Sequence, residues 1–227
     1  MQHIIDAKGK KCYYKVKDKS RRKEMDGIIQ VKDLSFSYGK KQIFSDVTFS
    51  LKKGCAAAVV GENGSGKSTL LACIAAAMHG THGQINVSGK TAYIPQETSL
   101  VEELSFNDNL KYFASLAHCK VPKTLPFDAD KYRKIKIKHM SGGMKKLCSI
   151  CCAFVGDADI YLFDEPCAGL DKEHREKLTG YITDLVKRGK TVMYVGHDEE
   201  EYSAFASLEI LVDGGKVTVR TLGEDKK

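Results

Sequence analysis

Hydrophobic and polar positions alternate in the first part of the chain, with a period near two. The pattern covers 29–36 and 47–51, where every second or third side chain is apolar. A period of two predicts short antiparallel strands that bury one face. Residues 55–60 (CAAAVV) differ, because they are apolar throughout and lead directly into a glycine-rich segment. This composition is typical of a strand that is buried on both faces.

The rest of the chain alternates between helical and strand patterns. Helices are expected over 67–78, after Ser105 with Asp108 completing its cap, over 143–155, and after a cap at Asp171. Strands are expected over 84–87 and 91–94, around a turn at 88–89, and over 160–163 and 191–195. Residues 208–212 and 216–221 predict a closing hairpin. Buried strands that alternate with helices predict an α/β fold with a mainly parallel sheet, preceded by antiparallel strands.

Length and charge limit how the chain is organised. Its 227 residues are enough for one α/β domain with a buried core. The net charge is +7, and residues 1–27 alone hold nine Lys or Arg against four Asp or Glu, a net +5. We therefore expect a basic arm over 1–27, one folded domain over 28–222 and a tail over 223–227. Because most of the excess charge lies in the arm, no nucleic-acid partner is expected.

The eight cysteines follow no disulfide framework, and reduced thiols in the cytosol are the simpler interpretation. Cys148, Cys151 and Cys152 stand on a predicted helix, where buried core thiols are favoured over a metal site. No run approaches eighteen apolar residues, so no membrane span is expected. A role at a membrane would then be that of a peripheral subunit.

Residues 61–69 (GENGSGKST) carry the first clear chemistry. Gly61, Gly66, Lys67 and Ser68 satisfy the pattern G-x-x-x-x-G-K-[ST], between a predicted strand and a predicted helix. Glycines let backbone N–H groups turn inward around phosphate oxygens, and the helix N-terminus favours negative charge. The lysine supplies a positive charge to the phosphates, and the hydroxyl can bind Mg²⁺. The residues expected to contact the nucleotide here are Gly61, Glu62, Asn63, Gly64, Ser65, Gly66, Lys67, Ser68 and Thr69.

Two acids follow the apolar strand 160–163. Asp164 and Glu165 stand at its carboxyl end, where parallel sheets bind their ligands. Asp164 is suited to a second Mg²⁺ contact. Glu165 is placed to orient or deprotonate an attacking water. Together with the phosphate loop, the pair predicts hydrolysis of a nucleoside triphosphate.

The order of these motifs resembles the nucleotide-binding subunits of ATP-binding cassette (ABC) transporters, from about residue 28 to 222. The most specific element is 140–144 (MSGGM), which is similar to the family signature LSGGQ and lies upstream of the acidic strand. Further matches are Tyr38 in SFSYG, Gln96 in YIPQE, the segment 168–171 (AGLD) that ends in Asp171, and His197 after TVMYV.

The resemblance implies a P-loop NTPase core with a helical subdomain over 97–158, and ATP and Mg²⁺ as cofactors. Tyr38 would stack on adenine, and Ser141, Gly142 and Gly143 would bind the γ-phosphate held by an opposite subunit, with Asp171 nearby. The implied catalytic residues are Lys67, Gln96, Glu165 and His197, and the implied Mg²⁺ ligands are Ser68, Gln96 and Asp164. The implied partners are a second nucleotide-binding subunit, identical or different, and transmembrane transporter subunits. The implied location is the cytoplasmic face of the cell membrane.

Some questions stay open at this stage. Met144 and Met140 replace the usual Gln and Leu of the signature, although the Ser–Gly–Gly core is intact. A composite site in a heterodimer, a regulatory subunit that binds nucleotide without hydrolysis, and a cassette ATPase that acts on DNA or ribosomes remain alternatives. The segment after Gln96 favours export over import. The basic run 131–138 is interpreted as a solvated face, with contact to anionic lipid as the alternative.

Overall fold

The computed structural model describes residues 2–5, 11–14, 27–76 and 78–222 of the chain. Most of the arm expected over 1–27, and the whole tail expected over 223–227, lie outside the described residues. Within the arm, β1 (Gln2–Ile5) and β2 (Lys11–Tyr14) form an antiparallel pair.

The centre of the fold is a six-stranded sheet with the order β11-β10-β5-β9-β8-β7. All neighbouring strands are parallel except the closing hairpin of β10 and β11. The mainly parallel sheet and the hairpin predicted from the sequence are thus confirmed. The strands are β5 (Ala56–Val60), β7 (Thr91–Ile94), β8 (Ile160–Asp164), β9 (Thr191–Val195), β10 (Leu208–Asp213) and β11 (Lys216–Thr221).

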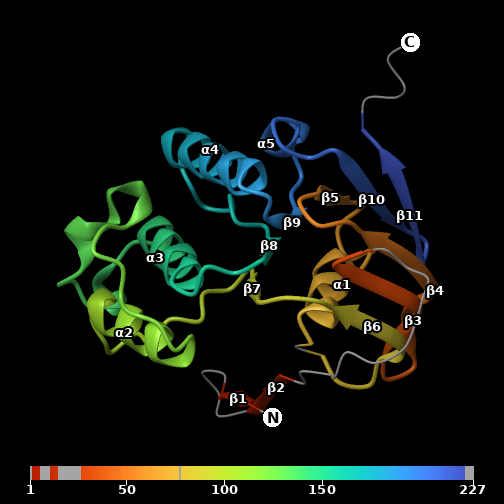
Figure 1. The fold of residues 1–227 in the computed structure, drawn as a ribbon, viewed down its shortest axis with the longest axis horizontal. Helices are drawn as coiled ribbons and strands as arrows, with labels where there is room; N and C mark the ends of the chain where they lie inside the picture. Colours follow the sequence, from red (N-terminus) through yellow and green to blue (C-terminus); the bar gives the residue numbers. More distant parts are fainter. Residues whose placement is uncertain (1, 6–10, 15–26, 77, 223–227) are drawn as a thin grey trace.

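A second, antiparallel sheet covers one side of this centre. It has the order β4-β3-β6, with β3 (Ile29–Tyr38), β4 (Lys41–Leu51) and β6 (His82–Val87). Helix α1 (Lys67–Ile74) lies beside it in Figure 1. One buried apolar cluster joins this sheet, α1 and one face of the central sheet.

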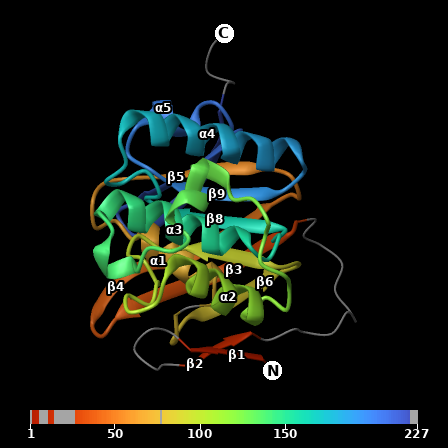
Figure 2. The same cartoon turned by 90° about the vertical axis from the view of Figure 1, so that its left-hand side faces the viewer.

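The other face of the central sheet is covered by helices. Helices α3 (Gly142–Phe154) and α4 (Lys172–Lys187) contribute to a second buried cluster, and α2 (Phe106–Leu116) packs on α3. Figures 1 and 2 show α2 and α3 on the side of the molecule away from α1. The helical turns η1 (Pro126–Tyr132) and η2 (Ile137–His139) and the short helix α5 (Glu199–Tyr202) complete the layer.

Strand β8 shows why a continuous apolar run predicts a central strand. Ile160 and Leu162 belong to the cluster on the α1 side, whereas Tyr161 and Phe163 belong to the cluster under α3 and α4. Successive side chains of a strand point to opposite faces, so both faces must be apolar when both are covered.

Three local expectations were wrong or incomplete. The helix expected over 67–78 ends at Ile74, because the chain turns at Ala76 with a φ of 56°. The strands around the turn at 88–89 belong to different sheets, since β6 pairs with β3 and β7 pairs with β8. Gly89 makes this change possible: its φ is 134°, and a Cβ there would lie 3.0 Å from the Asp159 side chain. Helix α5 was not predicted, because four residues carry too little periodicity.

Candidate functional site

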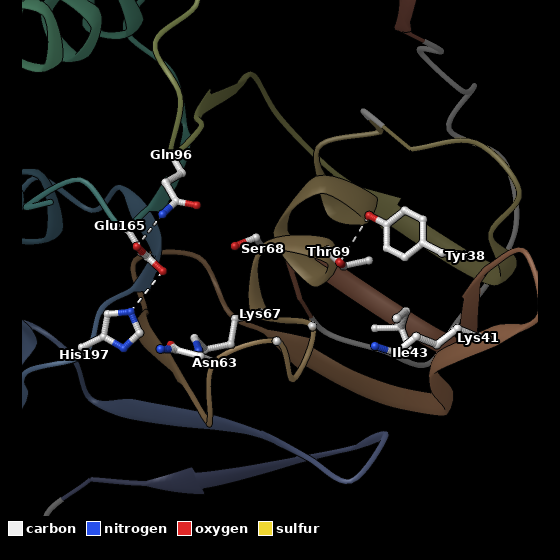
Figure 3. Close-up of a pocket in the computed structure, with 12 residues that line it drawn as sticks. Tyr38, Lys41, Ile43, Asn63, Lys67, Ser68, Thr69, Gln96, Glu165 and His197 are labelled. Carbon is white, nitrogen blue, oxygen red and sulfur yellow. Dashed lines mark hydrogen bonds and ion pairs between the residues drawn. The ribbon is translucent and has the colours of Figure 1, made fainter. Parts of the chain in front are cut away.

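Four loops with polar residues meet at the carboxyl edge of the central sheet. They follow β5, β9, β8 and β7, which stand next to one another in this order in the central sheet. Parallel strands deliver their following loops to the same edge. The pocket formed there is lined by Tyr38, Lys41, Ile43, Asn63, Gly64, Gly66, Lys67, Ser68, Thr69, Gln96, Glu165 and His197 (Figure 3).

The loop after β5 has a backbone that only glycine permits. Gly61 and Gly66 have φ values of 146° and 110°. A Cβ on Gly61 would lie 2.2 Å from the Val212 carbonyl oxygen, and one on Gly66 would lie 2.6 Å from Ile43 Cγ2. The glycines therefore let the loop fold closely against β10 and β4.

Lys67 and Ser65 of this loop are suited to hold phosphate oxygens. The Lys67 ammonium donates to the carbonyl oxygens of Gly61 and Glu62, both at 2.9 Å, and the residue is only 5% exposed. The Ser65 hydroxyl is buried without a hydrogen-bond partner among the described residues. A buried donor without a partner is costly, and a phosphate oxygen would satisfy it. The loop thus fits the phosphates of a nucleotide.

Ser68 and Asp164 form a pair suited to Mg²⁺. The Ser68 hydroxyl donates to Asp164 Oδ1 at 2.8 Å, and the Tyr93 hydroxyl donates to Oδ2 at 3.4 Å. Burial raises the pKa of Asp164, and the hydrogen bond from Ser68 opposes that shift. Mg²⁺ takes one or two protein oxygens and completes its shell with phosphates and water. The described residues contain no cluster of three His, Cys, Asp or Glu side chains that could hold a metal without a nucleotide.

Glu165 lies between Gln96 and His197. Its Oε2 accepts a hydrogen bond from Gln96 Nε2 at 2.8 Å, and its Oε1 lies 3.1 Å from His197 Nε2 (Figure 3). The backbone of Glu165 is left-handed, with a φ of 46°, and its amide donates to the Val195 carbonyl oxygen at 3.1 Å. A non-glycine residue in this conformation is strained, and such strain concentrates at functional positions.

Tyr38 forms the far wall of the pocket. Its side chain is 51% exposed, its ring contacts the edge of Phe36 at 4.9 Å between centroids, and its hydroxyl lies 3.5 Å from Thr69 Oγ1. An exposed aromatic ring held in place by a buried one is available for stacking. Lys41 and Ile43 line the same wall and were not predicted from the sequence, because they belong to no motif.

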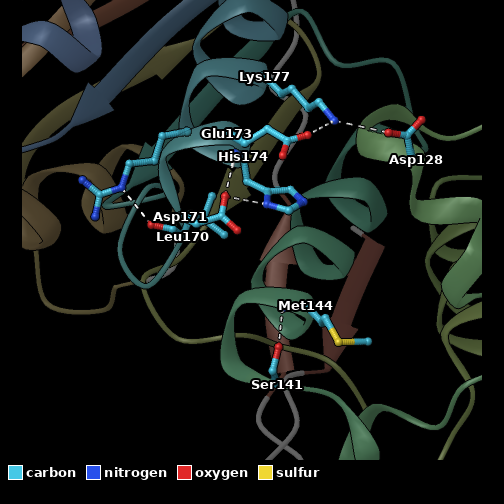
Figure 4. Close-up of polar contacts among 9 residues, drawn as sticks. Asp128, Ser141, Met144, Leu170, Asp171, Glu173, His174 and Lys177 are labelled. Carbon is cyan, nitrogen blue, oxygen red and sulfur yellow. Dashed lines mark hydrogen bonds and ion pairs between the residues drawn. The ribbon is translucent and has the colours of Figure 1, made fainter.

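The signature residues lie apart from this pocket. Ser141 caps α3, its hydroxyl accepting from the Met144 amide at 3.3 Å, and Gly142 and Gly143 form the first helical turn (Figure 4). Asp171 caps α4 by accepting from the His174 amide at 2.9 Å. Among the described residues, the pocket lining includes none of these four predicted residues, at 141–143 and 171. It also lacks Gly61, Glu62, Ser65 and Asp164, but these belong to the phosphate loop or contact Ser68 in it. One chain therefore brings the predicted site together only in part.

The free amides of 142–143 make the start of α3 suited to an anion. The first N–H groups of a helix have no partner within it, and the helix dipole favours negative charge at that end. Ser141 and Gly142 are exposed, and no atom of the described residues lies within 4 Å of a Cβ built on Gly142. The surface there is open to a ligand or a partner.

Comparison with known proteins decides the family. The ABC transporter family pattern matches residues 44–168, more than half of the chain. The chain belongs to the ABC transporter family. It is an ATP-binding subunit, and cassettes of this family hydrolyse ATP, dimerise and work with transmembrane subunits. In the part of this ABC subunit that the structure describes, no helix has the length and apolar character needed to cross a membrane.

Individual relatives agree with this assignment. The ABC-type transporter ATP-binding protein EcsA of Bacillus subtilis is 30% identical over 218 residues, which cover 87% of this chain and 88% of EcsA. An uncharacterized ABC transporter ATP-binding protein of Methanocaldococcus jannaschii is 29% identical over 83% of this chain and 75% of its own length. A solved ATP-binding subunit of an ABC transporter is 28% identical, with a TM-score of 0.78 over 86% of this chain and 90% of that one.

Proposed function

We propose that this subunit hydrolyses ATP with Mg²⁺ and couples the reaction to transport through separate transmembrane subunits. The observation that carries the proposal is the position of Glu165, whose two carboxylate oxygens contact Gln96 and His197 at the edge of a pocket that fits phosphates. The family assignment supports ATP as the nucleotide. One folded domain over 28–222, with a helical subdomain over 97–158, is the unit proposed to do this.

The site residues predicted from the sequence have definite tasks in the proposed reaction. Residues 61–69 bind the phosphates, with Lys67 as the fixed positive charge, and Tyr38 stacks on the adenine. Ser68, Asp164 and Gln96 hold Mg²⁺, which draws charge away from the phosphates. Glu165 accepts a proton from the attacking water, and His197 and Gln96 keep its carboxylate oriented toward that water.

The separation of 141–143 from the pocket supports a site shared between two subunits. In this proposal, Ser141, Gly142 and Gly143 of one subunit bind the γ-phosphate in the pocket of its partner, and Asp171 lies at the same interface. ATP then joins two subunits head to tail, and hydrolysis releases them. The intact amides of 142–143 support this task even though Met144 replaces the usual Gln, because anion binding there depends on backbone N–H groups.

The direction of transport is left open by the relatives, since relatives of similar identity are named for import and for export. The export predicted from the segment after Gln96 stays a prediction. Location on the cytoplasmic face of the membrane belongs to the proposal, and is supported by the family's dependence on transmembrane subunits.

Phosphate release by the purified subunit tests the proposal directly. We expect Mg²⁺-dependent ATP hydrolysis that is lost in Lys67→Ala and Glu165→Gln, whereas Lys52→Ala, at an exposed lysine after β4, leaves it intact. Glu165→Gln should still bind ATP. Turnover that survives both site substitutions would exclude the proposed residues. ATP binding without any turnover, alone or with transmembrane partners in vesicles, would favour a regulatory subunit instead.

A further inference from the structure

Lys146 is a buried cation on a helix whose other buried side chains are apolar residues, cysteines and one serine. Only two lysines in the described part of the chain are buried, Lys67 in the phosphate loop and Lys146, which is 4% exposed. Lys146 stands one turn after the start of α3, beside Leu147 and Cys148.

The ammonium group of Lys146 reaches out of α3 to the loop after β7. Its Nζ donates to the carbonyl oxygen of Gln96 at 2.9 Å and to that of Pro95 at 3.2 Å. Burial lowers the pKa of Lys146, and the charges of Asp164 and Glu165 oppose that shift. A buried charge is unfavourable unless its hydrogen bonds are made, so the two carbonyl groups are what hold Lys146 at this position.

Gln96 is therefore held at both ends. Its backbone carbonyl accepts from Lys146, and its side-chain Nε2 donates to Glu165 Oε2 at 2.8 Å. Gln96 itself is exposed and follows the last residue of β7 by two positions. Lys146 thus connects α3 to the carboxylate of Glu165 through one intervening residue.

We propose that Lys146 is a positioning residue that holds Gln96 against Glu165 and transmits displacement of α3 to that contact. The inference rests on the proposed function and adds a link within it. Helix α3 begins at Ser141 and Gly142, the residues proposed to bind the partner's nucleotide. A helix moves as a rigid element, so a shift at its first turn reaches Lys146 within the next turn. Occupation of one site then alters the Glu165 geometry of the other.

Steady-state hydrolysis in a double-substitution cycle tests this link. Lys146→Met removes the charge and both hydrogen bonds while it keeps the length of the side chain. We expect it to lower kcat about tenfold with the KM for ATP within about twofold, because the phosphate loop is untouched. In a Gln96→Ala background the same substitution should change kcat by less than about twofold, since its effect passes through Gln96. An equal loss of kcat in both backgrounds would overturn the inference.

Matched variants separate positioning from stability. Lys145→Met changes the neighbouring lysine, which pairs with Glu102 at the surface, and we expect wild-type kcat from it. Lys146→Gln keeps amide donors without the charge, so it should lose less kcat than Lys146→Met. If Lys146→Met does not fold, Lys146→Gln takes its place in the cycle. A loss of kcat in Lys145→Met equal to that in Lys146→Met would also contradict a specific role.

Hydrogen exchange of the nucleotide-free chain tests the inference without any hydrolysis. We expect faster amide exchange in Lys146→Met for residues 96–98, and unchanged exchange for the phosphate loop 61–69. Exchange over 96–98 equal to that of the wild type would overturn the inference, even if the protein hydrolyses ATP. The wild type could fail to hydrolyse ATP while Lys146→Met still exchanges faster at 96–98. That result would overturn the proposed function and leave the contact between Lys146 and Gln96 established.

Discussion

The Ser68 hydroxyl donates a hydrogen bond to Oδ1 of Asp164 at 2.8 Å, although the two residues lie 96 positions apart in the sequence. The contact joins the first turn of α1 to the end of β8. It places a hydroxyl and a carboxylate side by side below the phosphate loop, where each can bind the same cation. This arrangement disfavours the ionised form of Asp164, which is 2% exposed and whose pKa is raised by burial.

We predict that Asp164→Asn stabilises the nucleotide-free chain while it abolishes Mg²⁺-dependent hydrolysis. A raised folded-state pKa favours folding below the unfolded-state pKa of about 3.9 and becomes a penalty as the pH rises through the folded value. At pH 7 the substitution removes that penalty, and we expect Tm to rise by about 1–3 °C. The gain should shrink as the pH falls toward the unfolded-state pKa, because Asp164 takes up its proton at a higher pH in the folded chain than in the unfolded one.

Thermal unfolding followed by circular dichroism checks this prediction at several pH values. Asp184→Asn, at an exposed carboxylate on α4, is the matched control and should leave Tm unchanged at each pH. A gain for Asp164→Asn that persists in acid, or no gain at neutral pH, would show that burial of this carboxylate does not limit stability.

We next predict that Gln96→Ala and His197→Ala act through Glu165. Each removes one of the two side chains that contact its carboxylate, so each should lower kcat about tenfold, less than the roughly 10²–10⁴-fold expected for loss of a general base. In a Glu165→Gln background His197→Ala should change the residual rate by less than about twofold, whereas Gln96→Ala, which also removes a proposed Mg²⁺ ligand, should still lower it. Phosphate release measures all of these rates.

Two exposed residues of β6 provide the controls for that series. Gln84→Ala and His82→Ala remove the same side chains from a strand that does not contribute to the pocket, and we expect wild-type rates from both. An additive loss for His197→Ala in the Glu165→Gln background would mean that His197 acts on the nucleotide independently of Glu165.

The phosphate loop and the acidic pair were predictable because their chemistry depends on residues that are close in the sequence. A strand, a glycine loop and a helix start follow one another over 55–78, and the parallel sheet then fixes where Asp164 and Glu165 arrive. The pocket also contains Gln96 and His197, which the resemblance supplied and the residues alone did not distinguish from ordinary surface side chains.

Contacts between distant elements could not be predicted in the same way. Tyr93 reaches Asp164, and Lys146 reaches the carbonyl group of Gln96, only because α3 and β7 have a particular register relative to β8. No spacing in the sequence encodes that register. The end of α1 at Ile74 is a similar case, because an alanine-rich stretch favours a longer helix by its own propensity and the tertiary structure overrides it.

Substitution of Tyr38 is predicted to change the affinity for ATP and to leave the stability of the fold unchanged. Stacking of a base on an aromatic ring is worth about 1–3 kcal/mol, so Tyr38→Ala should weaken ATP binding roughly tenfold or more, and Tyr38→Phe should retain most of it. The side chain is 51% exposed, and we expect its removal to leave Tm nearly unchanged. Titration with a fluorescent ATP analogue measures the affinity. Tyr112→Ala, at a 40% exposed tyrosine on α2, should bind ATP as the wild type does.

The last prediction separates two roles of the first turn of α3, which are to begin the helix stably and to bind a phosphate of the partner's nucleotide. An acidic residue in the first turn of a helix is favourable by itself. Outside its own helical turn, a Cβ on Gly142 meets no atom of the described residues within 4 Å, so Gly142→Asp should keep or slightly raise Tm. The same carboxylate would repel a phosphate bound by the amides of 142–143. We therefore expect Gly142→Asp to abolish ATP-dependent dimers of the Glu165→Gln protein in light scattering.

Gly180→Asp, also in open space but on α4, should leave them intact. Dimers that survive Gly142→Asp would place the subunit interface elsewhere, and the pocket would then be complete within one chain.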